Sequence, residues 1–248
     1  MPGPLTRLLA VALGLAPIGG HAQGGPPLVT DDPETPGDGH WEINVATITE
    51  RTREQTAISA ADADINYGWG DRIQLKLDLP FEIVHTTDTG SRAGLGVGDL
   101  GVKWRFIDRG EDGLTVSTYP QFLSSWISSS TQRGVADRGH QFFMPLEAAL
   151  PAGEFHLDME AGRNYMSLGS NQWITGAVVG HACGPGAECL FEVRETIAPH
   201  ASSTLVNVGL HYGLTKSLIL LAAVGRDFGP MDTDPRRALV YLGIQVLR

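Results

Sequence analysis

The residues of this chain that could act on ions or solutes are charged side chains at alternate positions of short segments. Asp62 and Asp64 stand one residue apart, as do Lys76 and Asp78, with an apolar residue between each pair. Such a set can line a hydrated passage, and an excess of carboxylates would favour cations in it. The same set can instead be a mutually paired interior that blocks the passage. The full set is Glu42, Asn44, Asp62, Asp64, Lys76, Asp78, Asp99, Lys103, Arg105, Glu147, Asp158 and Glu160.

A hydrolase is the rival class of protein. It would need a nucleophile such as Ser124, Ser125 or Ser128 beside a histidine and an orienting acid. His140 and His156 are available, but the sequence has no Gly-x-Ser-x-Gly pattern and no spacing that ties these residues together. We therefore expect an exposed loop at the serine-rich stretch and no enzymatic activity. The alternative is a barrel enzyme acting on lipids, which loss of activity on mutating either histidine would reveal.

Acidic residues near the N-terminus, Asp31 and Asp32 with Asp38, suggest a calcium site at first sight. The stretch lacks the Asp-x-Asp-x-Asp-Gly loop and its later Glu, so we expect no metal there. A loose leader, or a segment that folds into the rest of the chain, is the better interpretation. If residues 23–39 enter an interior passage, they could act as a plug.

The two cysteines, Cys183 and Cys189, bracket a short Gly- and Pro-containing turn. In an exported chain this spacing favours a disulfide that pins a hairpin, with two free thiols as the alternative. No cluster of His or Cys accompanies them in the sequence, so zinc is not expected. We predict no cofactor.

The first residues have the features of a secretory signal. Arg7 supplies a positive charge, residues 8–18 form a short apolar run, and small residues surround His21 before Gln23. The run is too short to cross a bilayer, which takes about 20 apolar residues. A buried helix of the mature fold is the alternative, but we expect residues 1–22 to be a signal peptide.

Composition and charge limit the class of protein. The chain is 42% hydrophobic with 31 glycines and carries a formal net charge of −10. Nucleic-acid binding needs a basic footprint, so a nucleic-acid partner is not expected. The length suits one domain. We expect an irregular N-terminal segment over 23–39 and a single folded unit over 40–248.

From residue 40 to the end, segments of about ten residues alternate apolar and polar side chains, as β-strands do. In the clearest one, Ile73, Leu75 and Leu77 share one face while Gln74 and Lys76 share the other. Counting the weaker copies gives about twelve strands, an even number typical of bacterial barrels. Tight turns at 68–71, 151–154, 183–188 and 213–216 should lie at one end, and longer loops at 86–94, 124–138 and 226–236 at the other.

Alternation alone does not distinguish a soluble barrel from a membrane barrel, in which the apolar face points outward into lipid. Charged residues here fall in mid-strand in nearly every segment, and a barrel of about twelve strands is wide enough to hold them inside. Tryptophans fall near the expected strand ends, as in the aromatic girdles of membrane barrels. They are Trp41, Trp69, Trp104, Trp126 and Trp173. We predict an all-β, antiparallel, up-and-down transmembrane barrel.

Several short motifs also resemble a family of proteobacterial outer-membrane proteins named for the meta-cleavage pathway of phenol degradation. The first is Pro-Pro-Leu-Val-Thr-Asp-Asp-Pro at 26–33, followed by Trp41-Glu42. The others are Tyr67-Gly68-x-x-Asp71-Arg72 and the Gly-x-Gly-Asp-Leu stretch at 96–100. This resemblance implies a channel-like or transporter-like barrel that passes small solutes, aromatic or hydrophobic compounds among them. It also implies a location in the bacterial outer membrane, with outer-membrane lipid and the barrel insertion machinery as partners. A structural barrel with a plugged lumen is the alternative.

Overall fold

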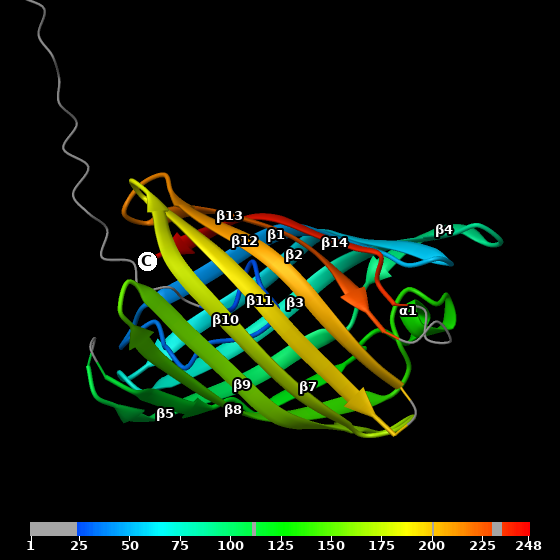
Figure 1. Ribbon diagram of the computed structural model, residues 1–248. Coiled ribbons are helices and arrows are strands. Elements are labelled where there is room, and N and C mark those ends of the chain that lie inside the picture. Colours follow the sequence, from blue (N-terminus) through cyan, green and yellow to red (C-terminus); the bar gives the residue numbers. More distant parts are fainter. Residues whose placement is uncertain (1–23, 111–112, 200, 230–234) are drawn as a thin grey trace, which may run out of the picture.

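The computed structural model describes residues 24–110, 113–199, 201–229 and 235–248 (Figure 1). The expected signal peptide at 1–22 lies outside these residues. The strands are β1 (Trp41–Arg51), β2 (Gln55–Trp69), β3 (Ile73–Thr86), β4 (Gly90–Leu95), β5 (Gly98–Asp108), β6 (Thr115–Thr118), β7 (Gln121–Ser124), β8 (His140–Ala152), β9 (Phe155–Met166), β10 (Gln172–Gly184), β11 (Ala187–Ala198), β12 (Ala201–Gly213), β13 (Leu218–Phe228) and β14 (Ala238–Leu247). Within the described part, the one helix is α1 (Ser128–Gln132), and no helix is long and apolar enough to cross a membrane.

The strands form one antiparallel sheet that closes on itself. β1 pairs with β2 on one side and with β14 on the other, from Glu42 opposite Leu247 to Arg51 opposite Ala238. The first and last strands therefore seal the wall. The prediction of a closed, antiparallel, all-β barrel is confirmed.

The 14 strands occupy 12 positions around the wall. β4 and β5 share one position, because β3 pairs with β5 through Ile73–Asp78 and with β4 through Phe81–Thr86. β6 and β7 share another, between β5 and β8. The break between them falls at Tyr119-Pro120, where the proline has no N–H to donate to a neighbouring strand. The expected count of about twelve strands is confirmed.

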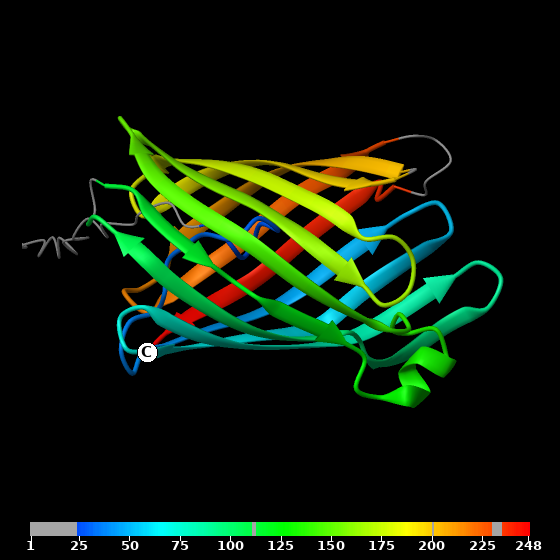
Figure 2. The same cartoon turned by 90° about the horizontal axis from the view of Figure 1, so that it is seen from below.

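The two ends of the barrel differ. The chain enters at one end, where β14 also finishes and tight turns such as β8–β9 lie (Figures 1 and 2). We call this the turn end. The opposite loop end carries α1 and the β3–β4 hairpin. The stretch 86–94, expected as a loop, forms most of this hairpin instead, because β3 continues past the barrel wall and needs a partner for its last residues.

Apolar side chains cover the outside of the wall and polar ones fill the inside. On β5, Leu100 and Trp104 are 47% and 53% exposed, whereas Lys103 between them is 1% exposed. In a soluble barrel the apolar residues of each strand would face the interior. In this barrel they face outward, which is the arrangement of barrels that lie in a membrane. The predicted tryptophans are all exposed near strand ends or, for Trp126, in the loop before α1.

Candidate functional site: a barrel interior crossed by an N-terminal strap

The interior of the barrel holds a stretch of the chain that belongs to no strand. Residues 24–36, which we call the strap, lie inside the wall as a loop (Figure 1). The strap lies against His211 near the turn end, reaches Gly176 partway along β10, and returns to Arg105 near the turn end. Leu28 and Thr30 are buried, as are Pro27 and Pro33. An extended, proline-rich segment suits this place, because wall side chains can satisfy its backbone.

One wall of the lumen binds the backbone N–H groups of the strap. The carboxylate of Glu192 on β11 accepts hydrogen bonds from the backbone N–H of Val29 at 3.1 Å and of Thr30 at 2.5 Å. Asn207 on β12 donates to the other oxygen of the same carboxylate at 3.1 Å. Glu192 is fully buried, so these contacts replace the water that an ionised carboxylate would otherwise need.

The opposite wall binds the strap through ion pairs. Lys103 on β5 donates to Asp31 Oδ1 at 3.0 Å and to the backbone carbonyl of Asp32, and Glu147 on β8 lies 3.5 Å from the same ammonium. Arg105 pairs with Glu34 two residues further along the strap's return. The strap therefore bridges β5 and β11 across the lumen.

The pKa values of the two aspartates of the strap are shifted in opposite directions. Burial raises the pKa of Asp31, but the ammonium groups of Lys103 and Lys76 outweigh it and hold the pKa below its usual value. The pKa of Asp32 lies well above its usual value, because burial outweighs the attraction of Lys103. Asp31 is thus the ionised partner of Lys103. The described residues contain no cluster of His, Cys, Asp and Glu fit for a metal ion.

Apolar contacts also hold the strap. Leu28 packs in a buried cluster with Val178, Leu190, Leu221 and Tyr241, all on the inner face of β10 to β14. Gly209 on β12 leaves room for it, since a Cβ there would lie 2.9 Å from Leu28 Cδ2. The barrel interior is therefore polar on the β1–β5 side and partly apolar opposite.

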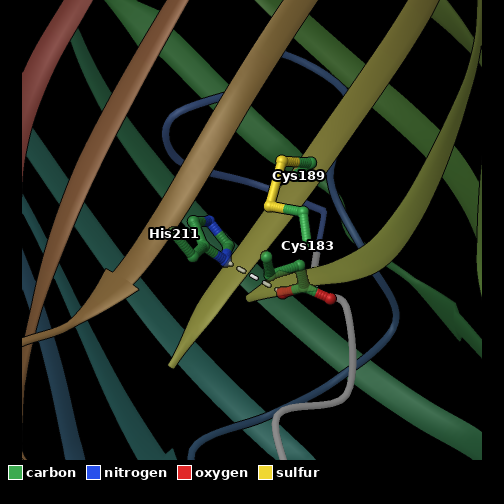
Figure 3. The surroundings of a disulfide bond; sticks show 4 residues. Cys183, Cys189 and His211 are labelled. Carbon is green, nitrogen blue, oxygen red and sulfur yellow. Dashed lines mark ion pairs between the residues drawn. A yellow bond between two sulfur atoms is a disulfide. The ribbon is translucent and has the colours of Figure 1, made fainter. Parts of the chain in front are cut away.

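At the turn end a histidine holds the start of the strap. His211 on β12 lies 3.1 Å from the carbonyl oxygen of Pro26 through Nε2. Its Nδ1 lies 3.4 Å from the Glu188 carboxylate (Figure 3). Cys183 and Cys189 form a disulfide across the β10–β11 hairpin beside it. Both neighbours of His211 are acceptors, so only the doubly protonated ring donates to both.

A carboxylate-rich wall remains beside the strap. Lys76 on β3 lies 3.8 Å from Asp64 and 3.5 Å from Asp99, and Asp78 follows it on the same inner face. A cavity of about 200 Å³ lies between this wall and the strap. Its lining includes Glu42, Asp64, Lys76, Lys103 and Tyr119 together with strap residues. The cavity could hold a small ion or a small organic molecule.

The structure places every residue of the expected lumen set on the inner face of its strand. The pairing is extensive: Asn44 contacts Glu42 and Asp64, Arg194 pairs with Glu160 at 2.5 Å, and His156 contacts Asp158 at 3.0 Å. Sequence reasoning placed Gln74 on the polar face of its strand but did not single out Tyr119, Glu192 or Arg194, which also face inward. The alternation of Phe191, Glu192, Val193 and Arg194 was a usable signal for Glu192. Nothing local pointed to its contact with Thr30.

The serine and histidine candidates for hydrolysis do not form a catalytic group in the described part of the chain. Ser124 and His140 lie opposite each other in the β7–β8 pairing, but no hydrogen bond joins them and no carboxylate orients the ring. His156 lies at the other end of the barrel wall, inside the lumen. The geometry therefore lacks the nucleophile, base and acid chain that acyl transfer needs.

Comparison with solved structures supports the fold. The COG4313 outer membrane channel from Pseudomonas putida F1 is similar over 89% of this chain and 100% of its own, with a TM-score of 0.66 and 14% identity. The NanC porin is similar over 82% and 98%, with a TM-score of 0.58 and 10% identity. The KdgM porin is similar over 83% and 98%, with a TM-score of 0.56 and 9% identity. No family model and no curated protein sequence matches the chain. At these identities the likeness shows the fold, which is that of bacterial outer-membrane channels.

Proposed function

We propose that the protein is a passive outer-membrane channel for small solutes, with its turn end toward the periplasm and its lumen narrowed by the strap. The observation that carries the proposal is the closed barrel whose polar, charged side faces inward and whose apolar side faces outward. Short periplasmic turns and longer external loops are the rule in such barrels, which gives the orientation. Outer-membrane lipid and the insertion machinery are the partners that this location requires.

The ionic preference follows from the lumen charges. Asp64, Asp78 and Asp99 surround Lys76 on one wall, so carboxylates outnumber ammonium groups along the free side of the strap. Carboxylates lining a passage lower the energy of cations in it and raise that of anions. We therefore propose a channel that prefers cations over anions of equal size.

The choice of organic solute rests on the resemblance of the N-terminal Thr-Asp-Asp and the Gly-Asp-Leu motifs to the phenol-pathway family. Small aromatic compounds are the first class to test. The cavity beside the strap, about 200 Å³, has room for a molecule of that size.

Uptake into liposomes tests the proposal. Refolded protein would be inserted into liposomes, and entry of labelled phenol, of a sugar and of a larger dextran would be compared with empty liposomes. Entry of the small solutes but not the dextran is expected, and faster entry of phenol than of the sugar would support the aromatic class. A folded barrel whose liposomes stay sealed to all of them would refute the channel and favour a structural barrel closed by its strap.

A further inference from the structure

A row of basic residues lies on the outer face of the wall where the barrel closes. Arg51 at the end of β1 pairs with Ala238 on β14. On the other side of β14, Gly225 pairs with Leu239, so the same register places Arg226 across from Ala238. Both arginines are exposed and both alternate with the inward residues of their strands, such as Glu50 and Asp227. They therefore flank Ala238 on the outside, two strand spacings or about 10 Å apart.

A cavity of about 470 Å³ lies next to this row at the loop end. Arg53, Arg226 and Arg237 line it, together with Phe228 and with Asp227, whose carboxylate is paired with Arg236. The guanidinium of Arg226 lies 4.8 Å from the centre of the Phe228 ring. Arginines from two turns, β1–β2 and β13–β14, thus converge on one space. Stacking on Phe228 restrains the Arg226 side chain, which lowers the entropy cost of binding an anion there.

The positive charge around this cavity is opposite in sign to the net charge of the protein. The protein carries a formal net charge of −10, yet Arg51, Arg226 and Arg237 form no ion pair with any residue that the structure describes. A neighbouring arginine, Arg236, does pair, with Glu50 and Asp227. Two acidic residues of the β13–β14 connection, Asp232 and Asp234, lie outside the described residues. The exposed guanidinium groups can therefore accept an anionic partner.

The height of the row on the wall indicates what that partner is. Directly toward the middle of the barrel the outer face turns apolar, with Val224, Val240 and Leu242 exposed. The arginines thus lie at the upper margin of the surface that would contact acyl chains. An anion held there by a lipid is at the right depth, whereas a solute on its way into the lumen would meet the inner face.

We propose that Arg51, Arg226 and Arg237, with Arg53 at the same cavity, bind the phosphate group of lipopolysaccharide, the phosphorylated glycolipid of the outer leaflet. Guanidinium groups bind phosphate oxygens through paired N–H donors, and two of them about 10 Å apart can reach one group between them. Val224, two residues closer to the middle of the barrel than Arg226, would contact the acyl region below, while Phe228 lies beyond Arg226 toward the loop end. The proposal rests on the orientation given above, with the loop end facing outward.

The test measures retained lipid. Wild-type protein and the triple variant Arg51→Gln, Arg226→Gln, Arg237→Gln would be extracted from outer membranes in mild detergent, and bound lipopolysaccharide would be measured by native mass spectrometry. The matched control is Arg109→Gln, an exposed arginine in the turn after β5 at the opposite end. We expect at least a tenfold loss of retained lipopolysaccharide in the triple variant and none in the control. Equal retention in all three proteins would overturn the proposal.

A second arm separates the lipid from a free anion. Delipidated protein would be titrated with purified lipopolysaccharide and with inorganic phosphate, with folding confirmed by the heat-dependent shift of the barrel on a denaturing gel. Saturable binding of lipopolysaccharide at concentrations at least a hundredfold below those of phosphate is expected. Equal affinity for both would replace the lipid site with a general anion site. Solute uptake by the triple variant should match wild type, so failure of this proposal and failure of the channel remain distinguishable.

Discussion

Thr30 of the strap lies directly against Gly176 of β10, so closely that a Cβ on Gly176 would come within 2.1 Å of the threonine Oγ1. Gly176 stands on the inner face of the strand, and no other side chain separates the two residues. The strap can occupy the lumen at this depth only because the wall has a glycine there. The relationship gives a way to displace the strap without altering any charge.

Gly176→Val should therefore raise the conductance of the channel. Valine suits a strand, so the wall is expected to form, but its side chain takes the space of Thr30 and expels the tip of the strap. Single-channel recordings in planar bilayers would measure the change, with Ala177→Val on the outer face of the same strand as control. A several-fold rise is expected for the inner substitution alone. Identical conductance in both variants would show that the strap does not limit the passage.

Replacing Glu192 should loosen the strap more gently. Glu192→Leu removes the acceptor for the Val29 and Thr30 amides, and hydrogen bonds to a charged group contribute about 1.5–3 kcal/mol each. Hydrogen–deuterium exchange of the 24–39 peptide should quicken at least tenfold. Glu195→Leu, on the outer face of the same strand, should leave the exchange unchanged. Protection that survives in the inner variant would mean that Lys103 and Leu28 hold the strap without Glu192.

The carboxylates around Lys76 should set the ionic preference. The double variant Asp78→Asn, Asp99→Asn removes two negative charges from the free wall and leaves the ammonium group in place. In a potassium chloride gradient its reversal potential should move from the cation-selective side toward zero, because the local field on permeating ions becomes less negative. Asp71→Asn in the β2–β3 turn is the control and should not shift it. If the reversal potential of the double variant equals that of wild type, the residues that set the ionic preference lie elsewhere in the lumen.

The disulfide should support stability and not transport. Cys183 and Cys189 close a short loop across a hairpin that the β10–β11 ladder already holds. A loop of this length corresponds to about 2 kcal/mol of chain entropy in the unfolded state. The double variant Cys183→Ser, Cys189→Ser should fold, conduct as wild type, and lose its folded gel mobility at a temperature a few degrees lower. Altered conductance would link the hairpin to the strap through its neighbour His211.

Much of the fold could be predicted from local pattern. Alternation such as Leu100, Val102 and Trp104 against Lys103 and Arg105 is a period-two property of a single strand, and it identifies strands and their two faces without knowledge of their neighbours. The count of strands and the alternation of short turns with longer loops follow in the same way. The β3–β4 hairpin was missed because Arg92 and its flanking glycines show no such alternation.

The interior was only partly predictable. The charged residues of the inner face were visible in the sequence, but their partners were not. Lys103 and Asp31 are 72 residues apart, and Thr30 and Glu192 are 162 apart. No local pattern encodes such contacts, because they depend on which strands face each other across the lumen.

The sequence by itself thus determined the strands, their inward and outward faces, and the acidic character of the interior, since each of these follows from the order of neighbouring side chains. Only the tertiary structure decided that residues 24–36 occupy the lumen and that Arg51 and Arg226 flank one alanine. Both depend on closure: the pairing of β1 with β14 sets the width of the barrel and the register across its seam. The strap fits inside because the closed wall is wide enough, and the two arginines flank Ala238 because β14 pairs with β1 on one side and with β13 on the other.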